Sequence, residues 1–138
     1  MGRDTLDLVW DCDECGTVQS AAAGSLRVGG RDGWSPEHLV SVAAEADLMA
    51  RFLQLAGREE LNVLGYLSAV NLGVKRGDAG GFRVVVRPCV VLAGPAEEPA
   101  ARRLLDRAFG ESPVCRSLKA VRLEAAFVVE PGGRSGGV

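Results

Sequence analysis

Two of the four cysteines lie in the segment DCDECG, where two residues separate Cys12 from Cys15. Dithiol redox centres use this spacing, and so does half of a zinc site. The neighbouring Asp11, Asp13 and Glu14 disfavour a thiolate, and one histidine and two further cysteines are available to complete a metal site. Three interpretations stay open: a redox pair, a metal site that takes ligands from a second subunit, and a surface turn without chemical function.

The other residues able to do chemistry have ordinary alternatives. Cys89 follows Pro88 in an apolar run, which predicts a small buried core residue. His38 is the one histidine, and we expect an exposed side chain in the first turn of a helix. The segment GGRDG, residues 29–33, lacks the preceding strand and the spacing of a nucleotide-binding loop, so we expect a turn there.

Composition narrows the class of protein. With 47% hydrophobic and 5% aromatic residues in a chain of 138, the core must be built from valine, leucine and alanine. Sixteen basic and 18 acidic residues give a net charge of −2 without a block of like charge, which argues against nucleic acid as a partner. The acidic N-terminus and the lack of a long apolar run predict a cytoplasmic protein without a membrane span. In that compartment cysteines are usually reduced.

Hydrophobic periodicity predicts an α+β protein with one domain over residues 1–130 and a disordered tail over 131–138. A helix should begin at Pro36 after the N-cap Ser35 and run to about residue 56. It is apolar nearly all round, which is typical of a buried central helix. One expected stripe holds Leu39, Val42, Ala43, Ala46, Met49, Ala50 and Leu53, with Leu48, Phe52 and Leu55 beside it. Strands are expected at 5–10, 61–74, 81–94 and 121–130, with one or two short strands within 17–28 and KRGDAG turning between the two long strands. A second amphipathic helix is expected at 95–109, and a short helical or turn segment at 113–119.

This order of elements resembles the OsmC/Ohr superfamily over roughly residues 25–130. The segments SPEHLVSVAAEADLMARFLQLA and ESPVCRSLKAVRLEAAFVVE carry the resemblance. It implies an OsmC-like fold, in which an antiparallel sheet wraps around a long buried central helix. It also implies an intertwined homodimer with active sites at the subunit interface, and it implies no cofactor.

The resemblance assigns roles to individual residues. Peroxidase members carry a reactive cysteine in the central helix after a Pro-Glu pair, and a second cysteine near the C-terminus in a motif close to Cys-X-X-Ser-X-X-Leu. Aligning Pro36 and Glu37 with the Pro-Glu pair puts Asp47 at the reactive position. The segment VCRSLK, residues 114–119, is similar to the C-terminal motif and puts Cys115 at the second position. Glu37 would then pair with an arginine that holds the thiolate, and we name Arg27 and Arg31 as candidates.

Asp47 decides between the functions that this resemblance allows. A thiolate attacks a peroxide, becomes a sulfenic acid and is captured by a second thiol, and a carboxylate does neither step. Asp47 is four residues from Arg51, so we expect an internal ion pair, with a catalytic carboxylate and an exposed or partner-facing aspartate as alternatives.

The sequence thus predicts a non-peroxidatic OsmC-like protein, with a pocket at a dimer interface for an apolar small molecule or a partner. The alternative is a thiol-dependent organic hydroperoxide reductase of oxidative-stress defence, which would use Cys115 with Cys12 or Cys15. A metal-binding module built on DCDEC is the third candidate.

Overall fold

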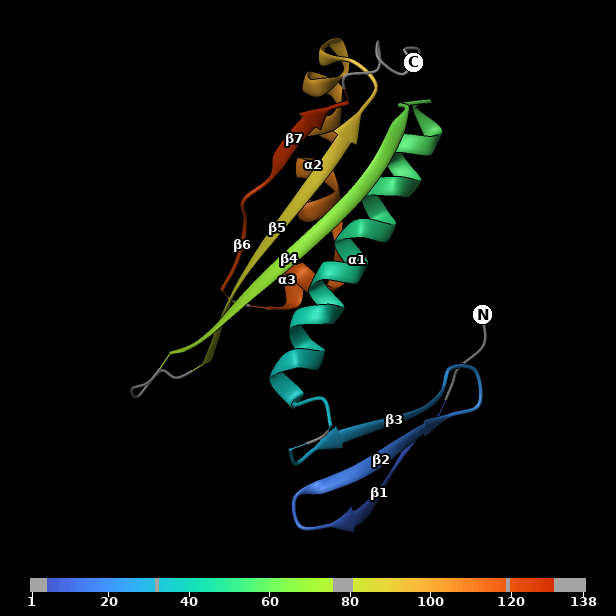
Figure 1. Cartoon of the computed structure of the whole chain (residues 1–138), viewed down its shortest axis with the longest axis vertical. Coiled ribbons are helices and arrows are strands. Elements are labelled where there is room, and N and C mark those ends of the chain that lie inside the picture. The colour runs from blue at the N-terminus through green and yellow to red at the C-terminus, as the bar shows by residue number, and fades with distance from the viewer. Residues whose placement is uncertain (1–4, 32, 76–80, 119, 131–138) are drawn as a thin grey trace. The chain divides into compact units, whose positions relative to one another are not determined.

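The computed structural model describes residues 5–31, 33–75, 81–118 and 120–130 (Figure 1). The chain divides into two compact units, Met1–Val40 and Ser41–Val138. The expected single domain over residues 1–130 stays a prediction. The tail over 131–138 and the hairpin turn at 76–80 lie outside the described residues.

The first unit holds a three-stranded antiparallel sheet in the order β1-β2-β3. Its strands are β1 (Leu6–Cys12), β2 (Cys15–Ser20) and β3 (Gly24–Gly29). Leu8 stands opposite Val18, which in turn stands opposite Leu26, so one face of the sheet is apolar. The other face carries Thr17 opposite Arg27. The strands expected at 5–10 and 17–28 are confirmed, with a short turn dividing the second into two.

Helix α1 (Pro36–Arg58) begins as the sequence predicts, because the His38 N–H donates to Ser35 Oγ at 3.0 Å. Its buried residues beyond the first turn are Ser41, Ala44, Leu48, Phe52, Leu55 and Ala56. The expected main stripe lies largely outside this set, and Val42, Met49 and Leu53 are 38–40% exposed. A helix that is apolar on most sides does not reveal its buried face by periodicity, so contact with the sheet decides it.

The sheet of the second unit is mixed, which corrects the expectation of a purely antiparallel one. Strands β4 (Val63–Lys75) and β5 (Gly81–Leu92) pair antiparallel as the predicted hairpin. The strand expected at 121–130 is divided into β6 (Val121–Leu123) and β7 (Ala126–Val129), and both run parallel to β5. Helices connect β5 to β6, and a helical crossover returns the chain to the starting end of the sheet, which makes the strands parallel.

The core of the second unit lies between the inner face of this sheet and the helices. The connection from β5 contains the 3-10 turn η1 (Pro95–Glu97), α2 (Glu98–Glu111) and α3 (Pro113–Ser117). They lie close to the helix expected at 95–109 and to the helical or turn segment expected at 113–119. The core residues of β5 and α2 are Val84, Val86, Val90, Leu92, Ala101, Leu104, Leu105 and Ala108. No helix in the described ranges is long and apolar enough to cross a membrane.

Cys89 corrects a sequence prediction. Its neighbours Pro88 and Val90 are both buried, so the two-residue period of β5 puts Cys89 on the outer face, where it is half-buried. It is therefore not a core residue. Residues on both faces of β5 are apolar, so the sequence did not indicate whether the odd-numbered or the even-numbered residues point into the core.

Candidate functional site

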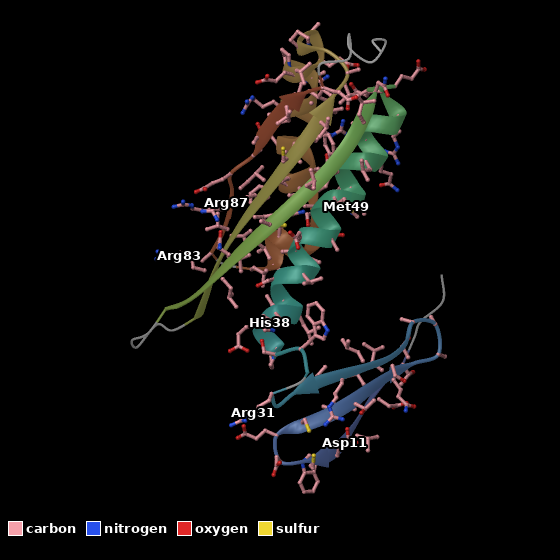
Figure 2. All side chains as sticks on the ribbon, in the orientation of Figure 1. Asp11, Arg31, His38, Met49, Arg83 and Arg87 are labelled. Atoms are coloured by element: carbon pink, nitrogen blue, oxygen red, sulfur yellow. The ribbon has the colours of Figure 1, made fainter. Side chains whose placement is uncertain are left out.

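The residues singled out from the sequence gather in two places, one in each unit. Cys12, Cys15, Arg27 and Arg31 lie on or directly after the three-stranded sheet of the first unit, where Arg31 and the nearby Asp11 are labelled in Figure 2. Asp47 and Cys115 lie in the second unit, in α1 and α3. Cys12, Cys15 and Arg27 belong to one hydrogen-bonded network, and Asp47 and Cys115 belong to another.

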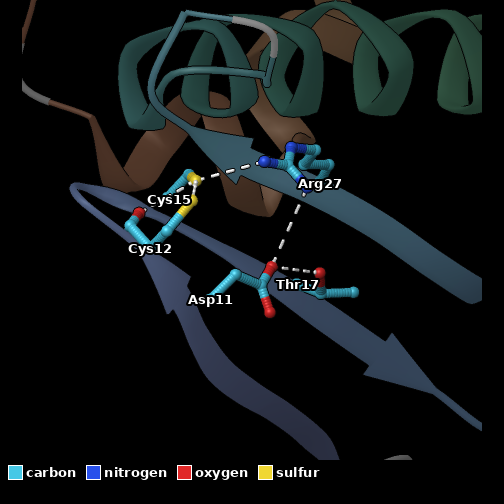
Figure 3. A network of polar contacts seen from close by, with 5 residues as sticks. All are labelled: Asp11, Cys12, Cys15, Thr17 and Arg27. Carbon is cyan, nitrogen blue, oxygen red and sulfur yellow. Dashed lines mark hydrogen bonds and ion pairs between the residues drawn. The ribbon is translucent and has the colours of Figure 1, made fainter.

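The two cysteines of the first unit close the turn between β1 and β2 (Figure 3). They are paired residues across the turn, their sulfur atoms are 3.4 Å apart, and the Cys15 thiol donates to the Cys12 carbonyl oxygen at 3.0 Å. The turn itself is braced, since the Trp10 indole N–H donates to the Asp13 carbonyl oxygen at 2.8 Å. A stiff turn therefore holds the two thiols in contact.

Arg27 binds this pair from the neighbouring strand. Its Nη2 donates to Cys15 Sγ at 3.2 Å, and its Nη1 is 4.0 Å from Asp11 Oδ2. Thr17 Oγ1 donates to the same Asp11 oxygen at 2.7 Å, which positions the carboxylate under the guanidinium. A cation in contact with a sulfur atom stabilises a thiolate. The structure brings Arg27 to Cys15, and the predicted pairing of Arg27 or Arg31 with Glu37 stays a prediction.

The pKa of Cys12 is raised above its ordinary value, chiefly because Cys12 shares a hydrogen bond with Cys15. The direction is the one expected for this segment, but the cause is the second thiol rather than the acidic residues. Within the part of the chain that the structure describes, no three histidine, cysteine or acidic side chains are grouped to hold a metal ion.

Two pockets of the first unit meet at Cys15. One has a volume of about 850 Å³ and is lined by Cys12, Asp13, Glu14, Cys15, Arg27, Gly29, Gly30 and Arg31. The other, of about 340 Å³, is mainly apolar and includes Leu8, Trp10, Val28 and Pro36 beside Cys15. Within the segment GGRDG, Gly30 and Arg31 form a turn after β3, as expected, and residue 32 lies outside the described residues. Gly29 has a φ of 78°, and a Cβ there would lie 2.3 Å from the Glu14 carbonyl oxygen, so only glycine fits this wall.

The start of α1 contains Glu37 and His38. Glu37 is half-buried in the first turn, where a carboxylate complements the helix dipole. His38 is exposed, as expected; its Nδ1 accepts from the Ser35 N–H at 3.3 Å, and its ring meets Trp34 edge to face at 6.2 Å. His38 thus takes part in capping the helix.

In the second unit, Asp47 is joined to the helix that carries Cys115. Ser112 Oγ donates to Asp47 Oδ2 and accepts from the Cys115 N–H at 3.1 Å, so Ser112 is at once the N-cap of α3 and the partner of Asp47. The predicted Asp47–Arg51 ion pair is wrong: among the described side chains Arg51 makes no ion pair with Asp47, and its Nε has no hydrogen-bond partner. The cap hydroxyl satisfies the carboxylate instead.

Cys115 is a buried thiol. It is 5% exposed, and its Sγ lies 3.7 Å from the Ala44 carbonyl oxygen. Burial raises the pKa of Cys115, the negative charge of Asp47 raises it further, and the hydrogen bond with Ser112 acts in the opposite direction. A cysteine in such surroundings stays protonated at neutral pH and reacts slowly.

Sequence reasoning missed a third group of polar residues, between α1 and β4. Glu45 Oε2, Tyr66 Oη and Ser68 Oγ are buried and have no hydrogen-bond partner. They line a pocket of about 220 Å³ together with Val42, Ala46 and Met49. Burial, and then the charge of Glu45, raise the pKa of Tyr66 above its usual range. The signals in the sequence were a lone tyrosine in an apolar strand and a glutamate in an apolar helix.

Solved structures with this fold extend over most of the chain. An OsmC-like protein of unknown function from Vibrio cholerae is 16% identical, with a TM-score of 0.78, and the match covers 91% of this chain and 99% of that one. An OsmC-like protein from Mycoplasma pneumoniae is 15% identical, with a TM-score of 0.78 and coverage of 92% and 98%. An organic hydroperoxide resistance protein from Elizabethkingia anophelis is 12% identical, with a TM-score of 0.69 and coverage of 91% and 96%.

The chain therefore has the OsmC-like fold, and the predicted resemblance is confirmed at the level of the fold. No protein-family profile matches the sequence, and no curated protein matches it.

The surroundings of Cys115 predict a thiol with a raised pKa, which loses its proton only at high pH. In a variant that keeps only this cysteine (C12S, C15S and C89S), the pH midpoint of alkylation by iodoacetamide should lie above the ordinary value of 9.0. Asp47→Asn should lower that midpoint, because it removes a negative charge and keeps an oxygen that accepts from Ser112. Mass spectrometry of the Cys115 peptide measures both values. A midpoint at or below 9.0 would contradict this account of the site.

Proposed function

We propose that this chain is a non-peroxidatic OsmC-like protein that binds a small molecule between α1 and β4, in a pocket completed by a second copy. The observation that carries the proposal is the Asp47–Ser112–Cys115 network. A carboxylate occupies the position that the resemblance gives to the reactive cysteine, and it is bound to the cap of the helix that holds the second cysteine.

The state of Cys115 supports the same conclusion. Peroxide reduction requires an accessible thiolate, whereas Cys115 is buried, and both its burial and Asp47 raise its pKa. Some structures with this fold are named organic hydroperoxide resistance proteins, which keeps a reductase using Cys115 with Cys12 or Cys15 as the alternative. In this alternative, the buried thiol would have to become accessible during the reaction.

The pocket between α1 and β4 supports a binding role. Val42, Ala46 and Met49 form an apolar wall, and Glu45, Tyr66 and Ser68 present polar atoms that lack partners. Buried polar atoms are normally satisfied, so these three favour an occupant that supplies hydrogen-bond donors. Such a ligand has an apolar body and a hydroxyl or ammonium group.

A homodimer would close this pocket. Met49 and Leu53 lie on the exposed side of α1, and Met49 lines the pocket (Figure 2). The apolar face of the first unit is also open: Leu6, Leu8 and Trp10 are 65%, 66% and 74% exposed. Apolar surfaces of this kind mark interfaces between proteins. We place the dimer in the cytoplasm, where its four free cysteines would stay reduced.

The first test is the consumption of cumene hydroperoxide by the reduced protein with dithiothreitol. The wild type should show no turnover above the uncatalysed rate. Asp47→Cys should raise consumption about tenfold or more, because it returns a thiol to the helix, and Asp47→Ser is the matched control without a thiol. Turnover by the wild type that disappears in Cys115→Ser would contradict the proposal and establish the reductase.

The dimer is tested by substitution on the exposed side of α1. Met49→Glu would bury an unpaired charge in the interface, so the dimer dissociation constant should rise about tenfold or more. Light scattering over a dilution series measures the molar mass of the protein at each concentration, and from it the dimer dissociation constant. Leu67→Glu is the control, because Leu67 is 64% exposed and points away from the core on β4. A wild-type protein that stays monomeric would contradict this part of the proposal.

The pocket is tested with hexylamine, which carries an apolar chain and an ammonium donor. The thermal midpoint of unfolding should rise by about 2–5 °C at saturation, and hexanoate, which brings a second negative charge to Glu45, should have no effect. Glu45→Gln should reduce the rise, while Asp106→Asn, which neutralises an exposed carboxylate on α2, should not. Equal shifts with both compounds would contradict recognition through Glu45.

A further inference from the structure

The Cys12–Cys15 pair lies in the first unit and takes no part in the function proposed above. Both thiols are free, and a two-residue turn holds the two sulfur atoms 3.4 Å apart. A disulfide needs about 2.05 Å between the sulfur atoms, so a small rotation of the side chains closes the bond. The backbone already pairs the two residues.

The charge beside the pair separates redox chemistry from metal binding. Arg27 Nη2 contacts Cys15 Sγ at 3.2 Å. A guanidinium there repels a metal cation at the same sulfur and stabilises a thiolate. Cys12 differs from Cys15, since the shared hydrogen bond raises its pKa. The two thiols therefore differ in their surroundings, because the guanidinium contacts Cys15 and not Cys12.

The larger pocket suggests what the pair would react with. Both sulfur-bearing residues line it, and so does Arg31, whose exposed side chain adds a second positive charge near Arg27. Asp13 and Glu14 also line the pocket, and their negative charges attract an ammonium group. At about 850 Å³ the pocket is large enough for a small peptide with both kinds of charge.

We propose that Cys12 and Cys15 form a dithiol–disulfide centre that exchanges with low-molecular-weight peptide disulfides bearing carboxylate groups. The Cys15 thiolate attacks one sulfur of the substrate disulfide, which forms a mixed disulfide and releases the first substrate thiolate. The Cys12 thiolate then attacks Cys15 Sγ, which closes the Cys12–Cys15 disulfide and releases the second. The two protons lost by the cysteines end on the two released thiols, so the substrate is reduced and the protein oxidised by two electrons.

The experiment uses the full chain, reduced and then mixed with glutathione disulfide. Samples are quenched by alkylation, and peptide mass spectrometry locates each modified cysteine. The wild type should form the Cys12–Cys15 disulfide. Cys12→Ser should accumulate a mixed disulfide at Cys15, about tenfold faster than Cys15→Ser accumulates one at Cys12. Circular dichroism establishes that both variants are folded.

Charge recognition is tested by comparing glutathione disulfide with cystamine, a disulfide that carries ammonium groups and no carboxylate. Arg31→Ala should lower the rate with glutathione disulfide relative to the rate with cystamine severalfold, because it removes a positive charge that attracts carboxylates. Arg87→Ala, which removes an exposed arginine from β5, should leave the ratio at the wild-type value. An unchanged ratio in Arg31→Ala would overturn the assigned substrate class.

Three further results would overturn the proposal. They are the absence of a Cys12–Cys15 disulfide, faster mixed-disulfide formation at Cys12 than at Cys15, and oxidation of the pair by cumene hydroperoxide but not by glutathione disulfide. None of them bears on the pocket between α1 and β4. The dithiol centre and the proposed function therefore stand or fall separately.

Discussion

The burial of one side of α1 determines where the chemistry of the second unit can lie. Leu48 and Phe52 pack into a core with the inward valines of β5 and the leucines of α2. Each fully buried side chain of this size contributes roughly 1.5–3 kcal/mol, so the rotation of the helix about its axis is fixed. With that rotation fixed, Asp47 meets the cap of α3 and Glu45 meets β4. The same rotation leaves Met49 and Leu53 exposed.

Elements were easier to predict than faces. The N-cap Ser35, the long hairpin and the short helix around Cys115 carry local signals, and each was found from the sequence. Which side of an apolar helix or strand points inward depends on contacts with residues distant in sequence. For that reason the sequence predicted the wrong buried face of α1 and the wrong face of β5 for Cys89. The parallel pairing of β6 and β7 likewise follows from the helical crossover and leaves no pattern inside the strands.

In the candidate sites, too, local features were visible in the sequence, whereas contacts between residues distant in sequence were not. The spacing of Cys12 and Cys15 was visible in the sequence, but the guanidinium in contact with Cys15 was not, because Arg27 is twelve residues away and arrives through the pairing of β2 with β3. Asp47 was singled out from the sequence, but its expected partner was Arg51 rather than Ser112. Ser112 is a buried cap residue whose hydroxyl both donates and accepts, and a serine in a sequence carries no mark of that double role.

Two thiols in this chain are buried to a similar extent and lie in opposite electrostatic surroundings. Cys115 is 5% exposed beside the carboxylate of Asp47, and Cys15 is 8% exposed beside the guanidinium of Arg27. The sign of the neighbouring charge separates them. The negative charge of Asp47 adds to burial in raising the pKa of Cys115, whereas Cys15 is in contact with a positive guanidinium. Thiol chemistry is therefore better supported on the hairpin, beside Arg27, than in the core, beside Asp47.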